Sequence, residues 1–266
     1  MFKNFKKNKN FTLPIPFNEL VGRETAAYFE DLPTDVEELI IGIAGCSPYL
    51  KTLLSIHKSW LQEIILKDEF DIISELDSEL INGSDLFQSL RACKSKMALW
   101  SAICDLSGLW DLDTVTQNLT RFADLVVEHC MEFEFRKFIK FNKSFNTVKK
   151  LNRSGWVAIA MGKMGASELN YSSDIDLIFL FDDSVYRSAQ FEEIRMFFIR
   201  MTRAVSKMLN ETSNAGYVFR TDFRLRPNPS VTPICLSMDS AMRYYESYGR
   251  AWERAAFIKA RACAGD

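Results

Sequence analysis

Two aspartates one residue apart, Asp174 and Asp176, are the side chains of this sequence best suited to chemistry. They follow a short segment that contains Gly162 and Gly165, and an apolar run, Leu177 to Phe181, comes directly after them. In an extended strand alternate side chains share a face, so the two carboxylates would lie about 7 Å apart along one side. Two carboxylates beside a buried strand are unfavourable unless a cation neutralises them. Hard oxygen ligands suit Mg²⁺, and a phosphate can complete its coordination, so the pattern predicts a Mg²⁺ site for nucleotidyl transfer.

The residues just before the two aspartates are candidates for binding phosphate. Gly162 and Gly165 allow the backbone to approach a ligand closely, and nearby polar side chains offer hydrogen-bond donors. These donors are Lys163, Ser167, Ser172 and Ser173. In the alternative interpretation Ser172 or Ser173 only caps the strand, and Lys163 is a solvated charge.

A third carboxylate is needed if two metal ions are to support in-line displacement at phosphorus. We expect Asp222 to supply this carboxylate from a third strand, residues 217–226, which can lie beside the strand that carries Asp174. Alternation in that strand places Arg220, Arg224 and Arg226 on the same face as Asp222. Arg224 and Arg226 would clamp phosphates, because the guanidinium fork matches phosphate oxygens in a bidentate way. The alternative is an edge strand with a salt-bridged polar face.

The elements that must position these side chains begin near Leu151, where a helical pattern changes to short apolar runs. The second part of the chain, 151–266, reads as a compact domain in which strands and helices alternate. Residues 190–209 carry apolar side chains at helical spacing and predict an amphipathic helix. Its expected buried stripe comprises Ile194, Phe197, Phe198, Met201, Val205, Met208 and Leu209. The remaining expected elements are strands at 156–161, 174–181 and 217–226, and a last helix at 239–263.

The first part of the chain predicts an all-helical module over residues 35–150, preceded by a flexible segment, 1–34. Apolar side chains recur at helical spacing throughout the module, including a helix over 86–109. Asp113 is a plausible N-cap for a helix from Thr114 to Phe138. The first residues are rich in lysine and are expected to be solvated.

Composition narrows the function classes. The chain has 266 residues, a formal net charge of −2 and a pI near 5.9, which argues against a protein that binds nucleic acid through its overall charge. A run of apolar residues long enough to span a membrane is absent from the sequence. The six cysteines form no metal-binding or disulfide pattern, so we expect them to be reduced and the protein to be cytoplasmic.

The segment from Met161 to Phe179, M-G-K-M-G-A-S-E-L-N-Y-S-S-D-I-D-L-I-F, resembles the signature of the bifunctional glutamine synthetase adenylyltransferase/adenylyl-removing family. The resemblance extends to D-F-R-L-R-P at residues 222–227 and to G-R-A-W-E-R at 249–254. It implies an α+β fold in which a helical N-terminal module precedes a polymerase-beta-like nucleotidyltransferase domain. Where that superfamily usually has Gly-Gly or Gly-Ser, this chain has Gly165-Ala166, so a backbone contact to phosphate is expected there.

The resemblance also implies a reaction. Members of the family carry two nucleotidyltransferase halves, and this chain resembles the N-terminal half, which removes AMP from a tyrosine of glutamine synthetase by phosphorolysis and releases ADP. By this resemblance Asp174, Asp176 and Asp222 would bind Mg²⁺. The family continues beyond the matching region, so we expect the chain to be a fragment without the adenylating centre. A PII-type signalling protein is a further expected partner of the regions outside it.

Two other functions stay open at this point. The chain could attach AMP from ATP instead of removing it, if the half is misassigned. It could also be an inactive module that only binds glutamine synthetase or a signalling protein. A nucleic-acid polymerase is disfavoured by the acidic pI.

Overall fold

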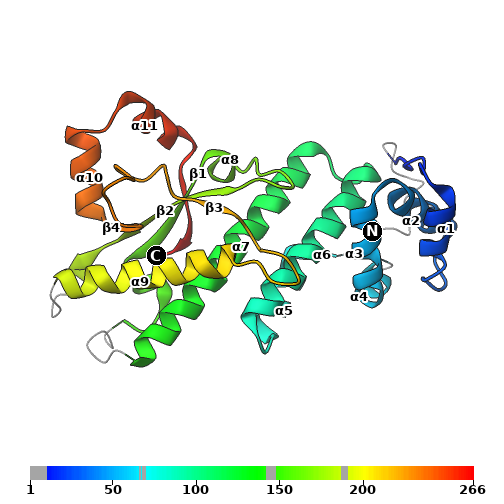
Figure 1. The fold of residues 1–266 in the computed structure, drawn as a ribbon, viewed down its shortest axis with the longest axis horizontal. Helices are drawn as coiled ribbons and strands as arrows, with labels where there is room; N and C mark the ends of the chain where they lie inside the picture. The colour runs from blue at the N-terminus through cyan, green and yellow to red at the C-terminus, as the bar shows by residue number, and fades with distance from the viewer. Residues whose placement is uncertain (1–10, 66, 68–69, 142–147, 187–190) are drawn as a thin grey trace. The chain divides into compact units, whose positions relative to one another are not determined.

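The computed structural model describes residues 11–65, 67, 70–141, 148–186 and 191–266. The chain divides into two compact units, Met1–Leu119 and Thr120–Asp266, and the boundary falls inside helix α7, Leu112–Phe141. The first unit is helical and the second contains a sheet with helices (Figure 1). The predicted α+β class is confirmed. In the described residues no helix is both long and apolar enough to span a lipid bilayer.

The first unit is built from helices that bury their aliphatic faces, as the apolar periodicity predicts. Polar side chains cap several of them: Asn18, Ser47, Asp71 and Asp85 each accept a backbone N–H at a helix start. The helices are α1 Glu19–Ala26, α2 Thr34–Cys46, α3 Pro48–Ile56, α4 Lys58–Ile64, α5 Ile72–Asn82 and α6 Leu86–Leu106.

The prediction of a flexible segment over 1–34 is wrong for its second half. Residues 19–26 form α1, because Asn18 caps it and Gly22 packs directly on the backbone of Ile41 in α2. The lysine-rich start, residues 1–10, lies outside the described residues, and so does Leu66. Helix α7 also begins earlier than predicted, since Asp111, and not Asp113, accepts the Thr114 N–H at 2.8 Å.

A five-stranded sheet organises the second unit. Strand β2, Ile175–Phe181, lies in the middle and pairs antiparallel with β1, Trp156–Met161. The two apolar runs predict both strands. Along its other side β2 pairs in parallel with two short strands, β3 Thr221–Asp222 and β4 Cys235–Ser237. The outer edge of β1 pairs antiparallel with β5, Arg261–Gly265.

Helix α9, Phe191–Asn210, packs on one face of this sheet. All seven side chains of the predicted stripe are buried, and Phe198 stacks on Phe181 with ring centroids 4.9 Å apart. Phe198 also contacts Trp156 of β1. Alternate residues of a strand point to opposite faces of the sheet. Helix α9 therefore covers the face that carries Phe179 and Phe181, and the even-numbered residues of β2 point to the opposite face.

Two predicted elements differ from the structure. The strand expected over 217–226 contains only Thr221 and Asp222, because the chain turns after Asp222, whose carboxylate accepts the Arg224 N–H at 2.8 Å. The helix expected over 239–263 is broken near Gly249, where Glu253 accepts the Arg250 N–H at 2.7 Å and starts a new helix. The segment consists of α10 Met238–Ser247, α11 Ala251–Ala256, the 3₁₀ turn η5 Phe257–Lys259, and strand β5.

The shorter elements complete the second unit. Helix α8, Gly162–Gly165, follows β1 directly, and the 3₁₀ turns η3 Leu151–Arg153 and η4 Asp183–Val185 flank the first two strands. All six cysteines are free, as predicted.

Candidate active site

Asp176 and Asp222 lie side by side at one end of the sheet. They are direct partners in the parallel pairing of β2 with β3, and on its other side Asp176 pairs with Met161, the last residue of β1. Two strands that are 46 residues apart in the sequence therefore bring the predicted carboxylates together: Asp176 in the middle, Asp222 beside it and Asp174 just before the strand begins.

Arginine side chains neutralise the two outer carboxylates. Arg220 Nε donates to Asp174 Oδ1 at 2.5 Å, and Arg224 donates through Nε and Nη2 to Asp222 Oδ2 at 2.7 and 2.5 Å. The prediction that arginines flank the acids is confirmed, although Arg220 pairs with Asp174 and not with Asp222. The Arg224 side chain is 85% exposed, so its charge is available to an anionic ligand.

Within the described part of the chain the central carboxylate, Asp176, forms no ion pair, and its pKa reflects this. Burial raises the pKa of Asp176, and the negative charges of Asp222 and Asp174 raise it further. The pKa of Asp222 is instead lowered, first by its hydrogen bond from the Arg224 side chain. A half-buried carboxylate beside two others attracts cations, which is the electrostatic condition for a metal site.

Gly162 shapes the edge of this carboxylate cluster. Its φ of +56° lies in the left-handed region, and a Cβ built on it would lie 2.7 Å from Asp176 Oδ2. Only glycine combines that backbone conformation with this space. Gly162, which the sequence predicts to contact phosphate, therefore lies directly against the Asp176 carboxylate.

The other predicted phosphate-binding residues of this segment are held by the protein. Gly165 packs so closely on η5 that a Cβ would lie 1.7 Å from the Lys259 carbonyl oxygen, so its need for glycine is explained by packing. Lys163 Nζ donates to Asn170 Oδ1 at 3.3 Å, and Ser173 Oγ also donates to Asn170 Oδ1. Lys163 and Asn170 are exposed, so both can still exchange these contacts for a ligand.

Arg226 is turned away from the carboxylates. Its three guanidinium nitrogens donate to the backbone carbonyls of Phe223, Pro229, Thr232 and Pro233 at 2.8 to 3.2 Å. It closes the loop between β3 and β4. The prediction that Arg226 clamps phosphate is not supported by any contact here, because every nitrogen is already used by the loop.

Two asparagines with no signal in the sequence complete the site. Asn210, the last residue of α9, accepts the Thr221 N–H at 3.0 Å and donates to the Thr221 hydroxyl at 2.5 Å. It therefore fixes the strand that presents Asp222. Asn170 gathers Lys163 and Ser173 beside the cluster. Neither position stands out from the pattern, because both roles depend on contacts that the fold creates.

The donor set suits Mg²⁺, because three carboxylates meet at one sheet end and phosphate oxygens could supply further ligands. Among the residues that the structure describes, no group of three Asp, Glu, His or Cys side chains is arranged to hold a metal ion as it stands. Asp174 and Asp222 are turned toward their arginines, so metal binding requires both side chains to exchange a guanidinium for the ion.

Comparison with known proteins decides which family this site belongs to. The family model described as glutamate-ammonia ligase adenylyltransferase matches residues 37–266, which include every residue of the site. The chain belongs to this family.

Relatives of this chain have names that mention two activities. Proteins named bifunctional glutamine synthetase adenylyltransferase/adenylyl-removing enzyme are 40% identical over 237 residues in Bradyrhizobium diazoefficiens and 42% identical over 233 residues in Rhodopseudomonas palustris strain BisB5. One from Bartonella quintana is 36% identical over 242 residues. These matches cover 84 to 86% of this chain and 24% of each relative, so the chain spans about a quarter of the length of the relatives that it matches.

Proposed function

We propose that this chain is a Mg²⁺-dependent nucleotidyltransferase that removes AMP from an adenylylated tyrosine of glutamine synthetase by phosphorolysis, giving ADP. The observation that carries the proposal is the pairing of Asp176 with Asp222 at the end of the sheet, with Asp174 beside them. The names of the relatives support the substrate and both directions of AMP transfer. The resemblance of the sequence to the removing half selects phosphorolysis.

The reaction moves one nucleotidyl group. An oxygen of inorganic phosphate attacks the phosphorus of the AMP group, the bond from phosphorus to the tyrosine oxygen breaks, and the tyrosine leaves as its hydroxyl after taking a proton. Mg²⁺ would neutralise the phosphate charge and align the reacting oxygens. Catalysis then depends on positioning and on charge rather than on a covalent intermediate with the protein.

Each site residue has a task in this proposal. Asp176, Asp222 and Asp174 would hold the cation, which would neutralise negative charge. Arg224, whose side chain is exposed, would be available to the attacking phosphate. The backbone at Gly162 lies next to Asp176, the Lys163 side chain is exposed, and both can donate to phosphate oxygens.

The direction of transfer is tested by offering the chain both substrates. With adenylylated glutamine synthetase, phosphate and Mg²⁺ we expect ADP. With unmodified glutamine synthetase, ATP and Mg²⁺ we expect no AMP incorporation. AMP incorporation without phosphorolysis would reverse the assignment and make this the adenylylating half.

A second candidate is a module that binds glutamine synthetase without turnover, and the arginine pairs on Asp174 and Asp222 favour it because they neutralise the carboxylates without a metal. Retained binding in a pulldown, with neither reaction detected, would support that reading. Glutamine synthetase, ATP or ADP and phosphate are the proposed partners in either case. A PII-type signalling protein and a cytoplasmic location stay predictions.

A further inference from the structure

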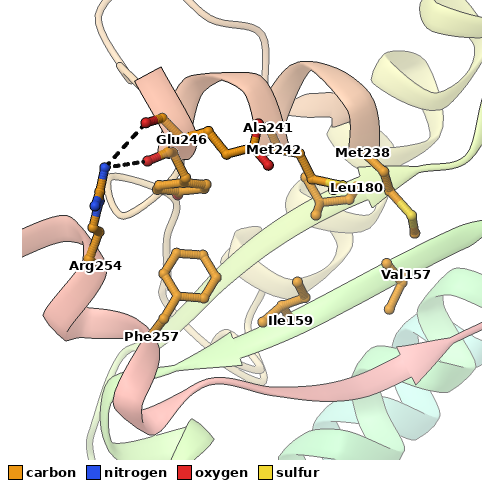
Figure 2. Close-up of a pocket in the computed structure, with 10 residues that line it drawn as sticks. Val157, Ile159, Leu180, Met238, Ala241, Met242, Glu246, Arg254 and Phe257 are labelled. Atoms are coloured by element: carbon orange, nitrogen blue, oxygen red, sulfur yellow. Dashed lines mark hydrogen bonds between the residues drawn. The ribbon is translucent and has the colours of Figure 1, made fainter. Parts of the chain in front are cut away.

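An apolar groove lies between the sheet and helix α10. It has a volume of about 760 Å³, within the range of about 300 to 1,000 Å³ that is usual for small-molecule sites. Figure 2 shows strands β1 and β2 on one side, α10 on the other and Phe257 of η5 at one end. The side chains that line it are mostly aliphatic, aromatic or thioether groups, among them Val157, Ile159, Leu180, Met238, Met242 and Tyr245.

The groove shares a face of the sheet with the carboxylates. In β2 the residues Asp176, Ile178 and Leu180 alternate and so point to the same side. The antiparallel register places Ile159 opposite Ile178 and Val157 opposite Leu180. At the usual rise of a strand, Ile178 and Leu180 lie about 7 and 13 Å from Asp176 along that face.

A second link joins the groove to the loop of the site. The Tyr245 hydroxyl, at the groove, donates to the carbonyl oxygen of Leu225 at 3.4 Å, and Leu225 follows Arg224 in the chain. The rings of Tyr245 and Phe257 meet edge to face with centroids 4.8 Å apart. Arg254 at the rim is engaged, since Nη2 donates to the carbonyl oxygens of Tyr245 and Glu246 (Figure 2). The groove is therefore apolar inside, lies on the sheet face that carries Asp176, and is tied by Tyr245 to the loop that follows Asp222.

We propose that this groove binds the adenine base of the nucleotide whose phosphate lies at Asp176. The proposal rests on the function proposed above and names the subsite that recognises the nucleoside. In a nucleotide the ribose separates the base from the α-phosphate by a distance comparable to that between Asp176 and Ile178. A planar base gains contact with aromatic rings and with methionine sulfur, and both surround this groove.

The test uses the chain labelled with ¹³C at its methionine methyl groups. Met238 and Met242 line the groove, whereas Met196 is exposed on α9, outside the groove lining, and serves as the control. Leu substitutions assign these three signals and those of Met161 and Met164. ADP is expected to shift Met238 and Met242 and to leave Met196 unchanged. Adenosine should shift the same two signals, in the intact chain and in Asp176→Asn, because the groove requires no phosphate, and ribose 5-phosphate should not.

An affinity comparison complements the spectra. Met242→Trp fills the groove from its rim and should weaken ADP binding about tenfold, while Met196→Trp should leave it unchanged.

If ADP shifts the signals of Met161 or Met164 beside the carboxylates but not those of Met238 and Met242, the base lies elsewhere. The groove assignment is then overturned while the proposed function stands. If adenosine shifts no methionine signal, the assignment is likewise overturned. Adenosine shifts in a chain that transfers no AMP would keep the groove assignment and reject the proposed function.

Discussion

Asp176 and Asp222 are paired directly across parallel strands β2 and β3, so two carboxylates of the same charge lie side by side at the end of the sheet. Like charges opposite each other in a sheet are unfavourable. The protein relieves Asp222 through Arg224, and leaves Asp176 with a raised pKa caused first by burial. The repulsion lowers stability, as expected if the carboxylates serve a function such as the proposed cation site.

Replacing Asp176 by Asn should therefore stabilise the chain in a metal-free buffer. The substitution removes the charge that repels Asp222 and Asp174, and it keeps the shape of the side chain. Urea unfolding in the presence of EDTA should give a higher midpoint for Asp176→Asn than for the intact chain. Added Mg²⁺ with ADP should raise the midpoint of the intact chain more than that of Asp176→Asn. A lower midpoint for the variant in EDTA would show that the carboxylate is structural.

Gly162→Ala should impair the site beyond its effect on the backbone. Both Gly162 and Gly216 have positive φ, so alanine at either position should lower the free energy of unfolding by about 1 kcal/mol. At Gly216 a Cβ meets nothing within 4 Å, whereas at Gly162 it meets Asp176 Oδ2 at 2.7 Å. Isothermal titration should show weaker Mg²⁺–ADP binding for Gly162→Ala only. Equal binding by both variants would contradict the contact.

Arg224 and Arg226 should differ in what they do, although they are two residues apart. Arg226→Lys cannot donate to four carbonyls and should lower the free energy of unfolding by about 1–2 kcal/mol. Arg224→Ala should leave the urea midpoint nearly unchanged and raise the KM for phosphate, because the side chain is exposed. If the KM for phosphate rises only in Arg226→Lys, and the two variants have equal free energies of unfolding, then Arg226 and not Arg224 binds the phosphate.

Stability of the helical unit should depend on pH through His57. Burial, and then the charge of Lys96, lowers the pKa of His57 below its ordinary value of 6.5, and Nε2 lies 2.6 Å from Ser95 Oγ. The unfolded chain then binds a proton more readily than the folded one, so stability is lost as pH falls from about 7.5 to about 5.5. His57→Gln keeps a polar group there and should lose less stability over this range in urea unfolding. If the free energy of unfolding changes with pH equally in both proteins, His57 is not the source of the pH dependence.

Parts of this fold and site could be predicted because they depend on local pattern. The period of the α9 stripe and the apolar runs of β1 and β2 follow from the sequence alone, and so do three carboxylates with arginines beside them. Strand β5 could not be foreseen, since Arg261–Gly265 lacks a strand pattern and gains its conformation by pairing with β1.

Tertiary contacts also explain the misplaced residues. In a continuous strand Arg226 would lie on the same face as Asp222. The chain instead turns after Asp222, and the Arg226 guanidinium points into the loop between β3 and β4. Lys259 and Arg261 fall within the range predicted as a helix, 239–263, but they lie in η5 and β5 and bind Glu168 at 2.7 Å and Asp124 at 2.8 Å. Asn210 acquires its role only when the end of α9 meets β3, and Asn170 only when the loop before β2 lies beside Lys163.

The most direct test of the central claim is ADP production from adenylylated glutamine synthetase. The intact chain is incubated with this substrate, inorganic phosphate and Mg²⁺, beside the same mixture with EDTA and beside Asp176→Asn. We predict ADP from the intact chain with Mg²⁺ and none from the two controls. Equal ADP from Asp176→Asn, or no ADP from the folded intact chain, would contradict the assignment of the Asp176–Asp222 pair as a nucleotidyl-transfer centre.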